Sequence, residues 1–146
     1  MQIRTTRFGL LELEPNDTLH FPAGVVGLED CRRWVLLADA QNSALGWLQS
    51  TTRPEVALAV VSPRRFVPHY QFKVYRSELA SLELEDVKDA QVLTIVSKNE
   101  RSITLNLKAP IVINLKRQLG RQVVANGDLP LQHELASSPA TLKKSA

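Results

Sequence analysis

Apolar residues along this chain fall into short runs that are separated by proline, glycine and polar residues. The runs are rich in the Val, Ile, Leu and Thr side chains that are typical of strands. We expect strands at residues 34–38, 55–62, 92–97 and 110–115. Prolines such as Pro54 and Pro110 lie at the margins of these runs, where a missing amide hydrogen least disturbs a sheet. This pattern predicts many short strands rather than a few long helices.

Alternation of apolar and polar positions marks two further segments. In residues 102–108 every second side chain is apolar, beginning with Ile103, so the apolar side chains share one face of the expected strand. The polar residues 98–101 have the length of a hairpin loop and join this strand to the one before it. Residues 70–75 repeat the alternation, beginning with Tyr70, and predict another strand.

Helix signals are sparse. Residues 77–90 offer Ser77 as an N-cap and Glu78 in the first turn, where a carboxylate suits the helix dipole. The apolar residues Leu82 and Val87 support only one or two turns of an amphipathic helix.

The dipeptide Asn126–Gly127 favours a turn with positive backbone dihedral angles. We expect it to join residues 122–125 to residues 128–131 as a β-hairpin. Together the elements predict an all-β fold, a small antiparallel β-barrel with one or two short helices.

The composition supports one folded domain with a basic extension. The chain has 146 residues, 44% of them hydrophobic, and a formal net charge of +3, which excludes a mostly disordered chain. We expect the barrel domain to span residues 1–135 and residues 136–146 to form a flexible basic tail. Without the tail, which holds Lys143 and Lys144, 16 basic and 15 acidic residues remain, a net charge of +1. Nucleic-acid binding is therefore not the default expectation.

The sequence carries no signal for a membrane or an oxidising compartment. No stretch approaches the ~18 consecutive apolar residues of a spanning helix, and acidic residues and Pro15 interrupt the N-terminal region early. The single cysteine, Cys31, cannot form an internal disulfide or a cysteine-based zinc site. We expect a cytoplasmic protein.

Candidate catalytic groups are scattered. His20, His69 and His133 lie far apart, and none stands at ligand spacing from another or from Cys31. A buried, inert thiol and solvated or hydrogen-bonded histidines explain these residues best. We expect no enzyme, no metal and no cofactor.

The loop Gly24-Val25-Val26-Gly27 is the first candidate for contact with a partner. Two adjacent branched apolar residues cannot both face inward in an extended loop, so one of them caps the barrel or meets a partner. Glu29 and Asp30 would repel a phosphate, which argues against a nucleic-acid clamp. Phe66, in a loop between two prolines, is a second candidate interface anchor.

Interleaved basic and aromatic residues suggest a different class of function. On an open barrel face, such a segment can stack on single-stranded RNA. The residues concerned are Arg64, Arg65, Tyr70, Phe72 and Lys73. In the competing interpretation, the two aromatic rings face the core and the arginines are solvated.

Several segments together resemble the FliW family of flagellar assembly factors. Residues 21–29 are similar to the family signature F-x-x-G-I-x-G-F-E, and residues 48–50 match its LQS. Residues 62–70 resemble its P-x-x-F-x-P-x-Y stretch. The most specific match is residues 104–114, which are close to T-x-N-L-x-A-P-I-V-I-N, and Gln122-Val-Val follows at the expected interval.

The resemblance spans residues 1–135, with Leu28 in place of the usual Phe. It implies a small β-barrel without catalytic activity that binds the RNA-binding translational regulator CsrA and relieves repression of its messenger targets. It also implies binding of flagellin, which competes for the same protein. Direct contact with nucleic acid is not expected, and charged, proline-bearing edges suggest a monomer when free.

The residues themselves suggest where the regulator docks. Our hypothesis is an apolar patch with an acidic rim, formed by Val25, Val26, Glu29, Phe66 and Tyr70. In the alternative, Val26 and Tyr70 are core residues and Glu29 is a solvated turn residue.

Three polar residues of the best-matching segment, Thr104, Asn106 and Asn114, have a structural explanation. We expect them to hydrogen-bond neighbouring backbone where the chain bends at Pro110, rather than to contact a partner.

Overall fold

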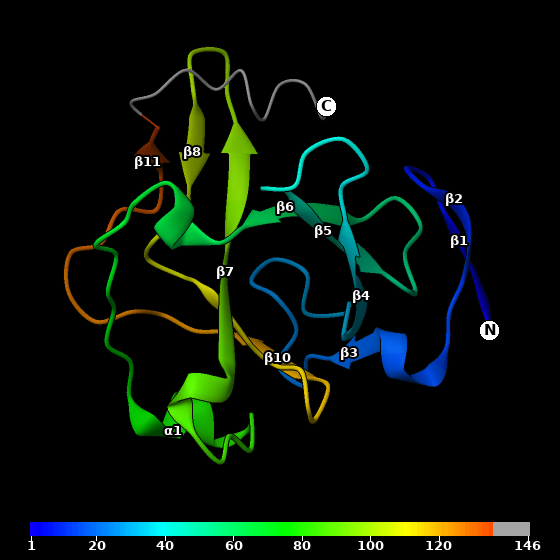
Figure 1. The fold of residues 1–146 in the computed structure, drawn as a ribbon, viewed down its shortest axis with the longest axis horizontal. Helices are drawn as coiled ribbons and strands as arrows, with labels where there is room; N and C mark the ends of the chain where they lie inside the picture. Colours follow the sequence, from blue (N-terminus) through cyan, green and yellow to red (C-terminus); the bar gives the residue numbers. More distant parts are fainter. Residues whose placement is uncertain (136–146) are drawn as a thin grey trace.

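Eleven short strands form almost all of the regular structure in residues 1–135, the part of the chain that the computed structural model describes (Figure 1). The strands are β1 Gln2–Thr5, β2 Gly9–Glu12, β3 Thr18–His20, β4 Arg33–Ala38, β5 Gly46–Ser50, β6 Ala57–Val61, β7 Ala90–Lys98, β8 Ile103–Leu105, β9 Ile111–Asn114, β10 Leu119–Gln122 and β11 His133–Glu134. One α-helix, α1 (Arg76–Ala80), and three 3-10 turns, η1 (Pro15–Asp17), η2 (Pro63–Arg65) and η3 (Val87–Asp89), connect them. The predicted tail, residues 136–146, lies outside the described residues.

Seven of these strands close into a barrel, which confirms the predicted fold class. Their order is β7-β6-β5-β4-β3-β10-β9, and β9 pairs again with β7. Most neighbours are antiparallel, but β10 and β3 run parallel and meet at Leu119 and His20. The first half of β7 pairs with β9 and its last three residues pair with β8, so β7 belongs to the barrel and also to a small outer extension, β7-β8-β11.

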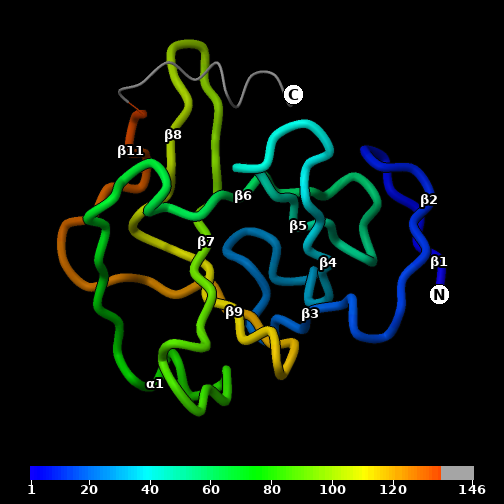
Figure 2. Tube along the Cα trace, in the orientation of Figure 1, coloured from blue at the N-terminus to red at the C-terminus, as the bar shows by residue number. Residues whose placement is uncertain are grey.

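The loop of residues 21–32 fills the inside of the ring of strands, as the blue tube in Figure 2 shows. Phe21, Val25 and Cys31 of this loop are buried in one core cluster with the barrel residues Trp34 and Leu48. The rings of Phe21 and Trp34 lie 6.2 Å apart, and Nε1 of Trp34 donates to the carbonyl of Cys31 over 3.0 Å. The barrel is therefore plugged by its own chain, and Cys31 is a buried thiol, as expected.

A hairpin of β1 and β2 packs on the outside of the barrel as a separate two-stranded sheet. Ile3 and the neighbouring Leu13 cover Val35 of β4. At the tip of the hairpin, the ring of Phe8 meets Trp47 of β5 edge-on at 5.9 Å, and the guanidinium of Arg7 lies 4.2 Å from the centre of the same indole. The side chain of Trp47 thus anchors the hairpin tip to β5.

Residues 70–75 do not form the predicted strand. Tyr70 is buried, Phe72 and Val74 are half-buried, and the residues between them are exposed, so the alternation is real. The segment is extended but pairs with no strand among residues 1–135. The carbonyl of Lys73 accepts a hydrogen bond from the amide of Asn126. An extended segment that is buried on one side shows the same alternation of apolar and polar residues as a strand, even when it pairs with no other strand.

The predicted hairpin around Asn126–Gly127 is also wrong. Gly127 has a positive φ of 90°, as the turn requires, but its two flanks do not pair with each other. Both flanks bond instead to residues 107–108: the amide of Ala125 donates to Lys108, and the carbonyl of Pro130 accepts from both residues of that pair. Residues 107–108 therefore lie between the two flanks and keep them apart.

The single α-helix begins at Arg76, with Tyr75 rather than Ser77 as its N-cap. The chain turns inward after five helical residues because Leu82 is completely buried, and Glu83 adopts a positive φ of 52°. Val87, expected on the apolar face of a helix of one or two turns, is exposed on η3.

We predict that Gly120→Ala destabilises the barrel because an added Cβ would lie 2.2–2.8 Å from three ring atoms of the buried Phe21. Overpacking of this kind costs about 1–3 kcal/mol of unfolding free energy. The matched control is Gly46→Ala, whose Cβ meets its nearest atom at 3.4 Å. Urea denaturation of both variants checks this; equal unfolding free energies would contradict the close packing of Phe21 on β10.

Candidate partner-binding surface

The loop of residues 21–32, which we call the plug loop, contains a tight turn. This turn places Val26 on the surface of the molecule. Val25 and Leu28 form an isolated antiparallel bridge, and the amide of Leu28 donates to the carbonyl of Val25 over 2.7 Å. Gly24 has a positive φ of 68°, and a Cβ at this position would lie 2.7 Å from the Cα of Glu29. Only glycine fits there, so the chain must reverse at this point.

The two valines of the turn face opposite ways. Val25 is 2% exposed and packs in the barrel core, whereas Val26 is 74% exposed. The sequence argument that both cannot face inward is confirmed, and Val26 is not a core residue.

Hydrogen bonds from distant and local side chains hold the turn in place. Oε1 of Gln122 accepts from the amide of Val26 over 2.9 Å, and Nε2 of the same side chain donates to the carbonyl of Ala109 over 3.1 Å. The carboxylate of Glu29 accepts from the amide of Gly27. Glu29 is therefore an exposed residue that also shapes the turn.

Sequence reasoning did not single out Gln122 as a functional residue. Its only signal was its place in the Gln-Val-Val motif, and its contact with Val26 joins positions 96 residues apart in the chain. After Gln122 the chain continues with Val123 buried and Val124 exposed.

A further exposed ring is linked to this region through α1. The amide of Val124 donates to the carboxylate of Glu78 over 3.2 Å, and the amide of Glu78 donates to the carbonyl of Tyr75. Tyr75 and Val124 are both among the large exposed apolar side chains. We call Val26, Gln122, Val124 and Tyr75 the Val26 surface.

The structure does not join Phe66 and Tyr70 to Val25 in one cluster. Val25 packs inside the barrel, whereas Phe66 and Tyr70 pack in a second core cluster with Leu105 and Leu107. Tyr70 is 5% exposed and Phe66 is half-buried. Of the five proposed contact residues, Val26 and Glu29 are exposed.

Tyr70 has a clear structural role. Its hydroxyl donates to the carbonyl of Leu107 over 2.7 Å, and its ring stacks on Phe72 with the ring centres 5.6 Å apart. Burial raises the pKa of Tyr70 to about 12. Because the ring is buried, a nucleobase cannot stack on it. Nε of Arg64 donates a hydrogen bond to the carbonyl of Tyr70 over 3.1 Å. The proposed RNA-stacking platform thus lacks its first aromatic ring.

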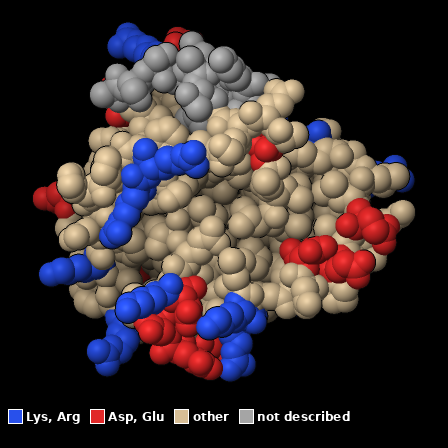
Figure 3. All heavy atoms as spheres, viewed as in Figure 1, with Lys and Arg blue, Asp and Glu red and all other residues tan. Residues whose placement is uncertain are grey.

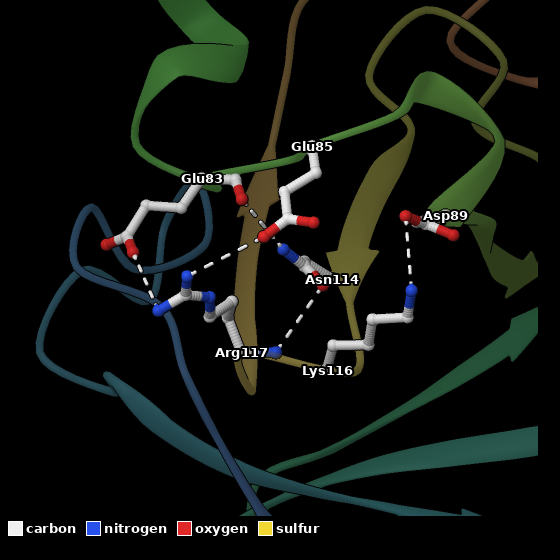
Figure 4. Close-up of a pocket in the computed structure, with 6 residues that line it drawn as sticks. All are labelled: Glu83, Glu85, Asp89, Asn114, Lys116 and Arg117. Atoms are coloured by element: carbon white, nitrogen blue, oxygen red, sulfur yellow. Dashed lines mark hydrogen bonds and ion pairs between the residues drawn. The ribbon is translucent and has the colours of Figure 1, made fainter.

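Asn114 is also structural, as Figure 4 shows. Its Nδ2 donates to the carbonyls of Leu82 and Glu83 over 2.8 and 3.3 Å, and its Oδ1 accepts from the amide of Arg117. Thr104 donates to the carbonyl of Ser97.

Asn106 completes the set, because its Oδ1 accepts from the amide of Ala109 beside Pro110. The expectation that all three polar residues bond to backbone is therefore confirmed.

Ion pairs surround Asn114. Arg117 lies 3.7 Å from Glu83 and 3.9 Å from Glu85, and Lys116 lies 3.4 Å from Asp89 (Figure 4). The cavity between them measures only about 20 Å³, which leaves room for no more than a water molecule. This cluster fastens the loop after α1 to the turn after β9.

On the face seen in Figure 3, acidic and basic side chains gather at the lower edge and acidic ones at the right, and basic side chains also lie across the upper left. Among residues 1–135, no three His, Cys, Asp or Glu side chains are grouped as metal ligands. In the same part of the chain, no helix has both the length and the apolar character needed to cross a membrane.

Comparison with known proteins gives one consistent result. The family model described as FliW protein matches residues 2–135. A flagellar assembly factor FliW of Natranaerobius thermophilus is 32% identical, over 100% of this chain and 99% of that protein. One of Moorella thermoacetica is 38% identical, over 87% and 82%. The solved crystal structure of a flagellar assembly factor FliW superposes with a TM-score of 0.87 at 27% identity, covering 94% of this chain and 99% of that one.

We predict that the folded protein loses stability as the pH rises from about 10 to about 12. In the unfolded chain Tyr70 ionises near the ordinary tyrosine pKa of 10.0, whereas burial raises the pKa in the folded state to about 12. Between these pH values the unfolded chain binds fewer protons at Tyr70 than the folded chain does, so the free energy of unfolding falls as the pH rises. Denaturant titrations of the protein and of Tyr70→Phe check this; an identical pH dependence above 10 would contradict it.

Proposed function

The chain belongs to the FliW family of flagellar assembly factors, and we propose that it works as a partner switch in the control of flagellin synthesis. In one state it binds a CsrA-type RNA-binding regulator and prevents it from repressing flagellin translation. In the other state it binds flagellin, which competes with the regulator. The level of free flagellin then sets its own translation by mass action.

The observation that supports this proposal best is the rigid, exposed Val26. A branched apolar side chain that is 74% exposed costs solvation free energy unless a partner covers it. Because the bonds from Gln122 and Glu29 fix the turn beforehand, little conformational entropy is lost when a partner binds. Apolar contact at a preorganised point is typical of an interface anchor.

The charge beside the turn indicates which partner uses it. Glu29 and Asp30 stand three and four residues after Val26 and are exposed, and Asp30 also pairs with Arg53 over 3.5 Å. A protein that binds RNA carries basic groups for the phosphates, so these carboxylates favour its approach and orientation. We therefore assign the Val26 surface to the regulator.

We predict that Val26→Glu weakens binding of the regulator at least about tenfold, because it places a charge at the centre of an apolar contact. The matched control is Val87→Glu, since Val87 is 75% exposed and lies on η3. Both variants should unfold like the parent protein because neither side chain is packed. Isothermal titration with the purified regulator measures the affinities.

Equal affinity of the Val26 and Val87 variants would remove the Val26 surface from the proposal. A chain that binds RNA but neither the regulator nor flagellin would contradict the function itself.

A further inference from the structure

The dipeptide Asn126–Gly127 lies in an outer loop and takes no part in the proposed function. Both residues are exposed, and residues 123–130 run along the left side of the molecule as the orange tube of Figure 2. Gly127 has a positive φ, and a Cβ built on it would meet no atom within 4 Å. The space around the peptide bond between the two residues is therefore open.

The two groups of this dipeptide that can react with each other are free of hydrogen bonds within residues 1–135. In this part of the chain the side chain of Asn126 has no partner, and the amide of Gly127 has no acceptor. The backbone beside them is anchored, because the amide of Asn126 donates to the carbonyl of Lys73 over 2.6 Å and Nζ of Lys108 donates to the carbonyl of Gly127. The fold thus positions the loop but leaves the carboxamide and the following amide nitrogen unprotected.

The other asparagines of the chain lack this combination. Asn16 is exposed, but it precedes Asp17, whose amide donates to the carbonyl of Glu14 over 3.0 Å. The remaining four share a side-chain oxygen that accepts a hydrogen bond from a backbone amide; they are Asn42, Asn99, Asn106 and Asn114. Within residues 1–135, a free carboxamide and a free following amide therefore meet at Asn126.

We propose that Asn126–Gly127 is a deamidation site, at which the folded chain slowly modifies itself with water as the co-reactant. Asparagine is among the thermally labile residues, and glycine has no Cβ to hinder attack by its own nitrogen. The amide of Gly127 loses its proton to solvent, and its nitrogen then attacks Cγ of Asn126. A C–N bond closes a succinimide ring, while Nδ2 of Asn126 takes up a proton and leaves as ammonia.

Water then opens the succinimide ring. Addition at one carbonyl gives an aspartate at position 126, and addition at the other gives an isoaspartate, whose main chain runs through the former side chain. No group is oxidised or reduced in either step. Both products carry a carboxylate in place of a neutral carboxamide, so the net charge of the protein falls by one.

The isoaspartate also lengthens the main chain by a methylene group just before Gly127. The amides of Leu107 and Lys108 donate to the carbonyl of Pro130 over 3.0 and 3.1 Å, downstream of the insertion. The amide of Ala125 donates to the carbonyl of Lys108 over 2.8 Å, upstream of it. The insertion should therefore displace the Pro130 acceptor and leave the bond of Ala125 in place.

Incubation of the purified full chain in mildly alkaline buffer tests the proposal, with peptide mapping by mass spectrometry as the readout. We expect Asn126 to deamidate at least about tenfold faster than Asn16, which is the exposed control within the same molecule. The rate should rise with hydroxide concentration because the attacking group is a deprotonated amide. An isoaspartate-specific methyltransferase should label the incubated parent protein, whereas Asn126→Gln, whose longer side chain cannot close a succinimide, should stay unlabelled at this position.

Two results would overturn the proposal. Equal rates at Asn126 and Asn16 would show that neither the glycine nor the free amide matters. Deamidation of Asn126 in the urea-unfolded chain but not in the folded chain would show that the fold protects this loop.

Hydrogen exchange of the isoaspartate-enriched protein tests the structural consequence. The amides of Leu107 and Lys108 should exchange faster than in fresh protein, while the amide of Ala125 keeps its rate. Unchanged exchange at Leu107 and Lys108 would contradict the displacement of the Pro130 acceptor. Since the proposed function plays no part in these measurements, either can fail without the other.

Discussion

The interior of the barrel has to be filled, and the chain fills it with its own loop. Phe21 and Val25 of that loop are buried against Trp34 and Leu48, and Gly120 of β10 leaves the space that the ring of Phe21 occupies. Once Val25 is inside, the tight turn that follows has to put Val26 outside. The most exposed candidate anchor of the molecule is therefore a direct consequence of core packing.

The exposed turn is shaped by bonds within the chain itself. The Val26 surface lies beside the carboxylate of Glu29, and bonds from the side chains of Gln122 and Glu29 hold its turn, so its shape exists before any partner arrives.

The sequence pattern correctly predicted the features that depend on residues close together in the chain. The main strands, the β7–β8 hairpin and the opposite orientations of Val25 and Val26 all follow from periodicity and turn chemistry. The pattern failed where distant segments decide: residues 70–75 alternate because they are buried on one side, and Tyr70 lies in a different cluster from Val25. Gln122 was missed as a functional residue because its bond to Val26 spans 96 positions.

Site-specific photo-crosslinking tests the central claim, that an exposed valine fixed by the plug loop is the contact point for the regulator. A photoreactive amino acid placed at Val26, and in a second protein at the equally exposed Val87, is irradiated with the purified regulator. The account predicts a crosslinked product from position 26 and none from position 87. Crosslinking from position 87 alone would contradict it.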